Sequence, residues 1–182
     1  MHRAGLVLPT IETPRLRLRA MGVEDAADLY AVFSDLEVVR YWSRAALTDV
    51  LEAVAMIEGQ AREPSLLQWG IFRVDENRLL GTCALADFDL PHRRASLGYA
   101  LGRDSWGQGI AREAVRALIK YGFETIALHR IGADVDPRNT RSLRMLAELG
   151  FSREGYQREC YLVGDEWQDA VLFGLLRREW SR

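Results

Sequence analysis

The chain has 182 residues, of which 48% are hydrophobic and 27% are charged, a composition typical of one globular domain with a sizeable core. Its 24 basic and 26 acidic side chains give a formal charge of −2, which provides no overall positive field for nucleic acid. Two cysteines are too few for a disulfide framework, and no apolar run is long enough to cross a membrane. We therefore expect a cytoplasmic protein with one domain over residues 1–182, which binds neither nucleic acid nor membranes.

In chain order, the first half of the sequence predicts a strand at residues 13–20, helices at 23–36 and 48–61, and strands at 67–74, 79–88 and 94–101. The first strand alternates apolar residues with Arg15, Arg17 and Arg19. This period of two places the arginines together on a solvent-facing side. Thr48 is the expected N-cap of the second helix.

The second half predicts a helix at residues 107–123, a strand at 129–135, a helix that begins after Asn139, and strands at 151–163 and 166–176. Asn139 is the expected N-cap of its helix, and Gly150 is the expected left-handed stop. Gly164 and Asp165 form the expected two-residue hairpin turn. The order β-α-α-β-β-β-α-β-α-β-β indicates one mixed α/β domain.

A glycine-rich segment, residues 102–111, lies between a predicted strand and a predicted amphipathic helix. Free N–H groups and the positive dipole at a helix start make an anion site. The segment lacks the Gly-Lys-Ser/Thr of a Walker loop, and Arg112 stands at the last glycine or alanine of a dinucleotide fingerprint. Two interpretations stay open: a site for the pyrophosphate of coenzyme A, or a turn that merely joins a strand to a helix.

Motifs along nearly the whole chain then show a family resemblance. They are TPRLRLR, GYALGRDSWGQGIAREAV, RIGADVDPRNTRSLRMLAELGF and GDEWQDAVLFGLLRREW. Together they resemble the GNAT superfamily of N-acetyltransferases, in its RimJ/RimL-like branch of ribosomal-protein N-terminal acetyltransferases. Trp106 stands where the superfamily usually has Gln or Arg, although aromatic residues are frequent there in this branch.

The resemblance implies a single GNAT domain of the α/β (α+β) class, with acetyl-CoA as co-substrate. Its mixed, mostly antiparallel sheet has about seven strands, is flanked by about four helices and splays in the middle to admit acetyl-CoA. Strand backbone would pair with the pantetheine arm, and loop and helix-start amides would hold the pyrophosphate. The implied cofactor-binding residues are Tyr99, Ala100, Leu101, Trp106, Gly107, Gln108, Gly109, Ile110, Ala111, Arg112 and Asn139.

Asn139 and Ser142 are the polar pair best placed for chemistry, because residues three apart share one face of a helix. Taken alone, the pair is typical of an ordinary helix cap. The resemblance implies that Asn139 contacts the cofactor arm and that Ser142 protonates the departing thiolate. Ser142 is therefore the expected catalytic residue.

The general base is open, because many relatives have a Glu in the pattern Ala-Glu-x-Gly-Tyr where this chain has Ser96. Asp87, Asp89 and His92 in the preceding loop are possible substitutes, and an acceptor that presents a neutral amine needs no strong base. Tyr99 could face the cleft or pack in the core. Tyr41 and Trp42 could line an acceptor pocket.

The most favoured acceptor is the α-amine of a protein or peptide N-terminus. The alternatives are a small molecule (a polyamine, an aminoglycoside or an amino acid) or a non-catalytic acyl-CoA-binding module. Cys83 reads as a core residue, and the His and Cys positions show no metal-ligand spacing, so no metal is expected. The sequence leaves the oligomeric state open, and a homodimer is one possible assembly.

Overall fold

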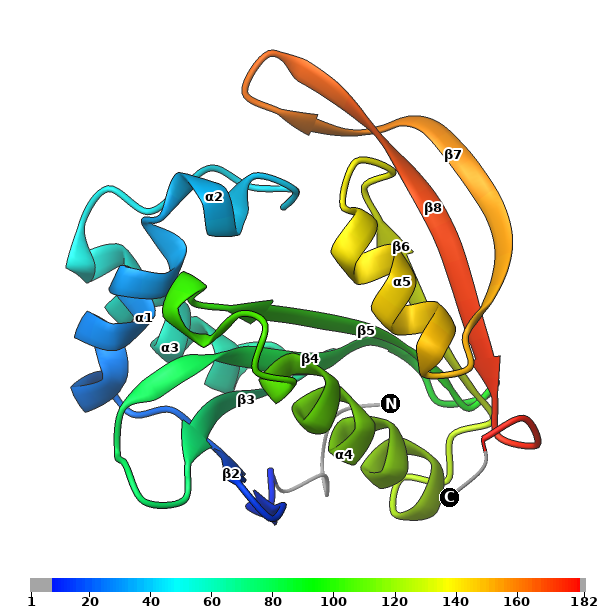
Figure 1. The fold of residues 1–182 in the computed structure, drawn as a ribbon, viewed down its shortest axis with the longest axis horizontal. Coiled ribbons are helices and arrows are strands. Elements are labelled where there is room, and N and C mark those ends of the chain that lie inside the picture. The colour runs from blue at the N-terminus through cyan, green and yellow to red at the C-terminus, as the bar shows by residue number, and fades with distance from the viewer. Residues whose placement is uncertain (1–7, 181–182) are drawn as a thin grey trace.

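The computed structural model describes residues 8–180. The strands are β1 (Ile11–Glu12), β2 (Leu16–Arg19), β3 (Leu66–Arg73), β4 (Leu79–Asp89), β5 (Arg94–Leu101), β6 (Arg130–Val135), β7 (Ser152–Val163) and β8 (Glu166–Leu176). The α-helices are α1 (Ala26–Phe33), α2 (Leu36–Val39), α3 (Val50–Arg62), α4 (Ile110–Glu124) and α5 (Thr140–Glu148). Two 3₁₀ turns, η1 (Val23–Asp25) and η2 (Arg103–Ser105), precede α1 and α4 (Figure 1).

One sheet connects all the strands of residues 8–180, in the order β1-β2-β3-β4-β5-β6-β8-β7. Its neighbouring strands are antiparallel except β5 and β6, which run parallel. The expected mixed and mostly antiparallel sheet is therefore confirmed. The parallel pair joins the first five strands to a second group formed by β6, β8 and β7.

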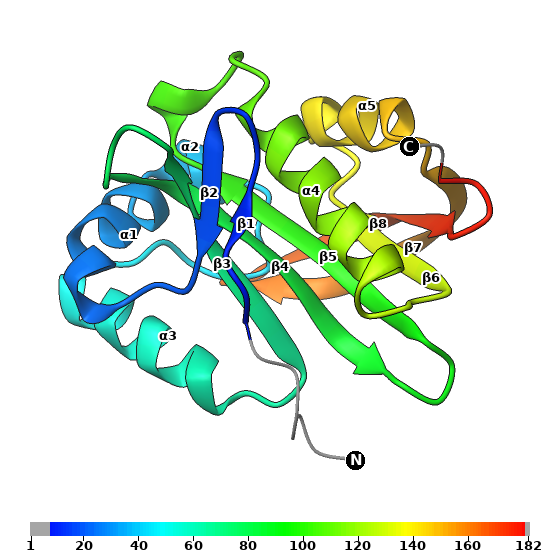
Figure 2. The same ribbon diagram turned by 90° about the horizontal axis from the view of Figure 1, so that it is seen from below.

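Helices cover both faces of this sheet. On one face, α4 packs over β2, β4, β5 and β6, and its buried residues join the larger hydrophobic core. On the other face, α1, α2 and α3 close a second core against β3 and β4. Figure 2 shows α4 and α5 side by side at one end of the view and α1 and α3 at the other. The alternating pattern of β2 follows from this packing, because Leu16 and Leu18 are both fully buried.

Two short elements are absent from the sequence-based prediction. β1 has only two residues, too few for any alternation to be visible. The expected helix over residues 23–36 is divided, because α1 ends at Phe33 and the Asp35 side chain accepts from the Glu37 amide to begin α2. These additions give eight strands and five α-helices within residues 8–180, against the expected seven and four.

The expected helix caps are right in one case and wrong in another. Asn139 caps α5, because its side chain accepts from the Ser142 amide at 3.1 Å. Thr48 is not the cap of α3: Asp49 accepts from the Leu51 amide, and the Thr48 hydroxyl instead donates to Glu52 at 2.6 Å. Adjacent Thr and Asp are both good caps, and the ionised carboxylate is the stronger acceptor.

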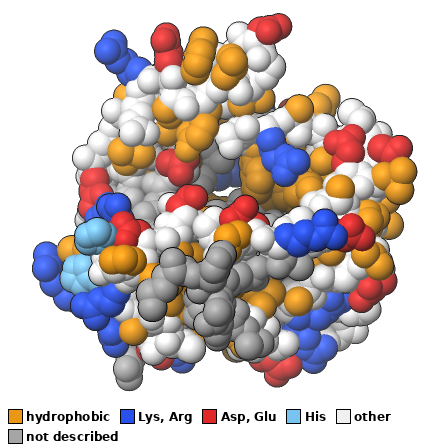
Figure 3. Space-filling view, turned by 180° about the vertical axis from the view of Figure 1, so that it is seen from behind, with side chains coloured by type: hydrophobic (Ala, Val, Ile, Leu, Met, Phe, Trp, Pro, Cys, Tyr) orange, Lys and Arg blue, Asp and Glu red, His pale blue; other side chains and the backbone are white. Residues whose placement is uncertain are grey.

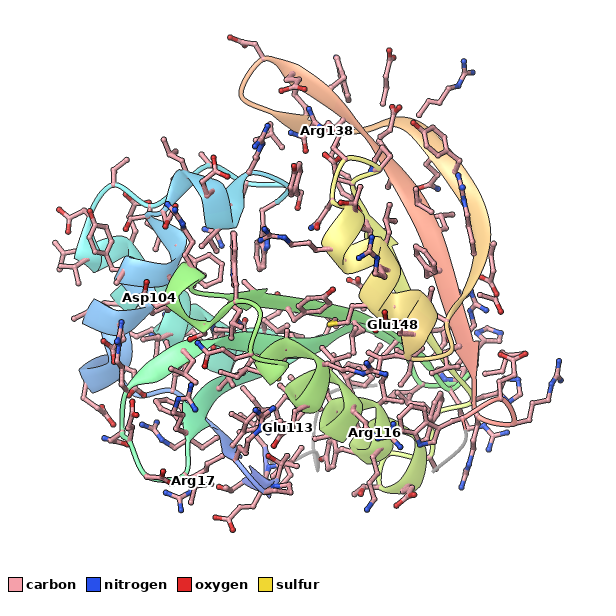
Figure 4. All side chains as sticks on the ribbon, in the orientation of Figure 1. Arg17, Asp104, Glu113, Arg116, Arg138 and Glu148 are labelled. Atoms are coloured by element: carbon pink, nitrogen blue, oxygen red, sulfur yellow. The ribbon has the colours of Figure 1, made fainter. Side chains whose placement is uncertain are left out.

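The β7–β8 hairpin leans over α5 and projects beyond the rest of the sheet (Figure 1). Its turn is the predicted one, with Val163 paired to Glu166 and Gly164 at a φ of 60°. Arg138, between β6 and α5, fastens the hairpin's end by an ion pair with Glu166 at 2.8 Å (Figure 4). The end of the hairpin therefore lies beside the loop between β6 and α5.

Gly150 provides the predicted left-handed stop after α5, at a φ of 92°. We expect Gly150→Ala to lower the free energy of unfolding by about 1–2 kcal/mol, because an L side chain is strained in this conformation. Leu175 Cδ1 would lie 3.7 Å from the new Cβ, an ordinary contact, so the cost comes from the backbone. Urea unfolding measures the change.

The matched control is Gly59→Ala within α3, where a new Cβ meets nothing within 4 Å. There we expect stabilisation of about 0.5–1 kcal/mol, because alanine is the better helix former. Equal effects of the two substitutions would contradict the assignment of a left-handed stop to Gly150.

Candidate functional site

The parallel pair β5–β6 holds together over only three residue pairs. Arg94 pairs with Arg130, and the pairing ends at Ser96 with Gly132. Both strands continue beyond this point, β5 to Leu101 and β6 to Val135. The two strands therefore diverge, and the edge of β5 that faces β6 has backbone groups without a neighbouring strand. Such an edge can accept an extended ligand as a further strand.

A cleft of about 210 Å³ lies where the strands diverge. The molecular surface is hollowed between the two groups of strands (Figure 3). The lining residues come from the segment after α2, from β5, from β6 and α5, and from the hairpin. They are Tyr41, Trp42, Ser43, Leu97, Gly98, Tyr99, Ala133, Asp134, Val135, Asp136, Asn139, Ser142, Leu146, Tyr161, Gln168 and Asp169. Tyr41 and Trp42 thus lie where the sequence analysis suggests, in the wall of a pocket.

Two hydroxyl groups meet in this cleft. Tyr99 of β5 and Ser142 of α5 share a hydrogen bond of 2.5 Å. Burial raises the pKa of the Tyr99 hydroxyl, against a smaller opposite effect of its hydrogen bond with Ser142. Both groups are therefore protonated near neutral pH and can donate a proton. The sequence left open whether Tyr99 faces a cleft or packs in the core. In the structure its side chain lines the cleft.

Asn139 also lines the cleft, but its side-chain oxygen is engaged in capping α5. This cap fixes the backbone of Ser142 and so orients the serine. The amide nitrogen of the same side chain remains a donor for a ligand. Capping and ligand contact are compatible at this residue.

The glycine-rich loop begins with a backbone anchor. The Trp106 indole N–H donates to the Leu101 carbonyl at 2.6 Å, and the Arg141 guanidinium lies 5.0 Å above its ring. Gly107 and Gly109 then take φ angles of 73° and 74°, which only glycine adopts readily. A Cβ on Gly107 would meet nothing within 4 Å, so the space beside the loop is open.

The helix after the loop begins at Ile110, three residues later than the expected start at residue 107. The reason is the left-handed Gly109, which is the N-cap rather than a helical residue. The first bond within α4 runs from the Glu113 amide to the Gly109 carbonyl at 3.0 Å. The amides of Ile110, Ala111 and Arg112 precede it and have no helical acceptor, so they form an anion-binding helix start.

Two arginines from distant parts of the chain hold this loop, Arg15 from the bend before β2 and Arg73 from the end of β3. Arg15 donates to the Gln108 carbonyl at 3.0 Å and to Glu113 at 2.6 Å, and Arg73 donates to the Gln108 side chain at 2.5 Å. Figure 4 shows Glu113 on α4 beside β2. The sequence pattern assigns Arg15 only to a solvent-facing strand side. Its contact with residues more than ninety positions away has no local signal.

Of the remaining expected cofactor residues, Ala100 and Leu101 are buried and pair with β4. Only the backbone edge of these two residues that faces away from β4 could meet a ligand. Arg112 extends from the first turn of α4 and pairs with Glu148 of α5 at 3.1 Å (Figure 4). Apart from Asn139 at the start of α5, the expected residues therefore follow one path, from β5 through the loop to the start of α4.

The three proposed substitutes for the missing strand carboxylate do not line the cleft. Asp89 is engaged by Arg94 and by the His92 ring, each at 2.8 Å, and the hydrogen bond with His92 lowers the pKa of Asp89. Asp87 lies on the same strand at a φ of 52°, also outside the lining. Ser96, at the position of the missing carboxylate, is half-buried and does not line it either.

Three other carboxylates do line the cleft, and sequence reasoning missed them: Asp134, Asp136 and Asp169. Acidic side chains border the hollow in Figure 3. Alternation along the predicted strand could have placed Asp134 on the side away from the core. Nothing local could have shown which side becomes a pocket.

Other candidates behave as structural residues. Cys83 is 1% exposed, and burial raises the pKa of its thiol well above the usual range. Within residues 8–180, no group of three or more His, Cys, Asp or Glu side chains could hold a metal ion. In the same range, no helix is both long enough and apolar enough to span a bilayer.

Comparison with known proteins identifies the family to which the chain belongs. The sequence model of the acetyltransferase (GNAT) domain matches residues 15–152. The chain is 38% identical to an uncharacterized N-acetyltransferase, p20, of Bacillus licheniformis, over 96% of this chain and 99% of that protein. It is 31% identical to the [ribosomal protein uS5]-alanine N-acetyltransferase of Escherichia coli, over 99% of this chain and 97% of the relative.

Solved structures agree in fold. A GNAT-family acetyltransferase from Bacillus anthracis superposes with a TM-score of 0.84 at 26% identity, over 94% of this chain and 100% of the other. Spermidine N-acetyltransferase from Vibrio cholerae, solved with CoA and spermine, has a TM-score of 0.82 at 21% identity, over 92% and 98% of the two chains. The latter likeness concerns the fold alone.

Arg15 offers a test of how the loop is held. We expect Arg15→Ala to speed hydrogen exchange of the first bonded amides of α4, from Glu113 onward, by about three- to ten-fold, because a half-exposed ion pair contributes about 1 kcal/mol. Arg17→Ala is the control, since Arg17 pairs with Glu12 of the neighbouring strand β1. Mass-spectrometric exchange measures both variants. Equal protection of these amides in both would mean that Arg15 does not hold the start of α4.

Proposed function

Because the chain belongs to the GNAT family of acetyltransferases, we propose that it transfers the acetyl group of acetyl-CoA to the α-amine of a protein or peptide N-terminus. The chain is an N-acetyltransferase, and the proposal concerns its acceptor and the residues that act. The observation that carries it is the hydroxyl pair of Tyr99 and Ser142, set where β5 and β6 diverge.

The residues present fit acetyl-CoA. Gly107 and Gly109 leave room for a diphosphate beside the amides that begin α4, and a negative ligand is favoured at a helix N-terminus. In this proposal, Trp106 to Arg112 bind the pyrophosphate. The free edge of β5 from Tyr99 to Leu101 hydrogen-bonds the amide-containing arm, and Asn139 donates to the same arm.

Acetyl transfer to an amine forms a C–N bond and breaks a C–S bond, and a proton must reach the leaving sulfur. A thiol of this kind ionises near a pKa of about 8.5, so a weak hydroxyl acid is sufficient to protonate it. Ser142 supplies this proton in our proposal, and Tyr99 hydrogen-bonds to Ser142 and can replenish it. Because burial raises the pKa of Tyr99, its hydroxyl carries at neutral pH the proton that it would pass on.

The α-amine is favoured as acceptor for two reasons. It ionises near a pKa of about 7.7–8.0 and a lysine amine near about 10.4, so far more of the α-amine is neutral at pH 7. This suits a site in which Ser96 replaces a strand carboxylate. The similarity to the uS5-alanine enzyme over nearly the whole chain points to the same acceptor class.

Ser142→Ala should lower kcat by about ten-fold or more, the lower end of what general acids contribute. The affinity for acetyl-CoA, measured by calorimetry, should change little, because the Ser142 backbone amide still donates to Asn139, the N-cap of α5. Ser65→Ala, which removes an exposed serine hydroxyl, is the matched control. Unchanged turnover in Ser142→Ala, with turnover lost in Tyr99→Phe, would assign the proton to the tyrosine instead.

An acceptor screen tests the proposed function directly. We expect thiol release from acetyl-CoA with a short peptide that begins with alanine, and none with the same peptide blocked at its N-terminus. Spermidine and an aminoglycoside should give a kcat/KM at least about 100-fold lower, the discrimination typical of a polar acceptor site. Faster release with spermidine than with the peptide would replace the proposed acceptor by a polyamine.

A further inference from the structure

The three carboxylates of the cleft differ in their partners. Asp136 is 7% exposed and pairs with Arg138 at 2.7 Å. Asp169 accepts hydrogen bonds from the Tyr156 hydroxyl and from a backbone amide, and the bond from Tyr156 lowers the pKa of Asp169. Asp134 accepts only one bond, from the Tyr161 hydroxyl to its Oδ2 at 2.7 Å. Among residues 8–180 its Oδ1 has no hydrogen-bond partner, so this oxygen is available.

Asp134 also differs in the face of the sheet that it occupies. Its neighbours on β6, Ala133 and Val135, are buried in the core under α4 and α5, so Asp134 points to the opposite face. Ser96 pairs with Gly132 and therefore shares that face. Asp134 lies two residues beyond Gly132, on the part of β6 that has left β5. Ser96 of β5 provides no carboxylate on this face. Asp134 of the adjacent strand β6 does.

The hydroxyl pair lies on the other face. Tyr99 follows Leu97 by two residues on β5, and Leu97 belongs to the core under α4. Ser142 comes from α5 itself. The diverging strands thus form an opening through the sheet, with two proton donors on the helix-covered face and one free carboxylate oxygen on the opposite face. In the proposed function, acetyl-CoA on the helix-covered face and the amine on the opposite face would use this division.

We propose that Asp134 is the general base of the transfer, an inference that rests on the proposed function. The amine nitrogen bonds to the thioester carbonyl carbon, and the electron pair of the breaking C–S bond goes to sulfur. The proton that nitrogen loses goes to Asp134 Oδ1, directly or through one water, and Ser142 gives one proton to the thiolate. One proton is taken up and one is released, so the step balances.

Tyr161 is the positioning residue for Asp134. Burial, with the hydrogen bond and charge of Asp134 as further causes, raises the pKa of the Tyr161 hydroxyl above its usual range. The hydroxyl therefore keeps its proton and goes on donating to Oδ2, which leaves Oδ1 directed to the cleft. The other titratable groups whose charges act on Tyr161 are Cys160 of β7 and Asp87 of β4, and Asp169 of β8 acts in turn on Cys160.

The test is Asp134→Asn, which keeps the size of the side chain and an oxygen for Tyr161 but cannot accept a proton. Steady-state kinetics with the alanine peptide should show kcat near pH 7 lowered about ten-fold or more, with KM changed by less than about three-fold. The deficit should shrink as pH rises to about 9.5, because hydroxide can take the proton. Tyr161→Phe should lower kcat less, and the conservative Asp134→Glu should restore part of it.

Asp75→Asn, in an exposed turn, is the matched control and should match the unchanged chain at every pH. A raised KM with normal kcat in Asp134→Asn would mean that the carboxylate only binds a cationic acceptor. An equal loss at every pH would mean a structural role, and either result overturns the inference.

Failure of the proposed acceptor can be distinguished from failure of the base. If the unchanged chain prefers spermidine, the acceptor proposal fails and the Asp134 comparison is made with spermidine. If the unchanged chain acetylates the peptide and Asp134→Asn does so equally fast, the acceptor proposal stands and the base assignment fails.

Discussion

β5 and β6 pair over three residues and then diverge, and every part of the site depends on where that pairing stops. Parallel strands in an otherwise antiparallel sheet need a long crossover, here provided by α4. The crossover starts at the glycine loop, so the element that connects the two strands also supplies the anion-binding amides. The divergence of β5 and β6, with the crossover that connects them, therefore produces the free strand edge, the pocket and the helix start together.

The opening has a different chemical character on its two faces. Helices α4 and α5 cover one face, where the half-buried hydroxyls of Tyr99 and Ser142 lie, whereas the opposite face carries Asp134 of β6. The hydroxyl pair and the Asp134 carboxylate are thus kept apart by the thickness of the sheet. The side-chain alternation of two strands is sufficient to produce this separation.

Much of the fold follows from local patterns, because amphipathic periods and caps act over a few residues. Asn139, Gly150 and the turn at Gly164 behave as the sequence predicts. The family resemblance supplied the loop and Ser142, which composition and spacing alone left open. The contact of Arg15 with Gln108 and the position of Asp134 could not be predicted, since both depend on which distant strands become neighbours. The late start of α4 was missed because a glycine is compatible with either helical or left-handed backbone, and only the structure shows that Gly107 and Gly109 are left-handed.

The place of β8 in the sheet has a consequence for biosynthesis. β8 lies between β6 and β7, so β6 has no partner on that side until β8, the last strand of residues 8–180, has been made. A nascent chain on the ribosome can complete the β2–β5 part early, but the second wall of the cleft must wait for residues 166–176. Partial chains released too soon would carry the anion-binding loop without its opposing wall. The cleft is therefore complete only when β8 has joined the sheet.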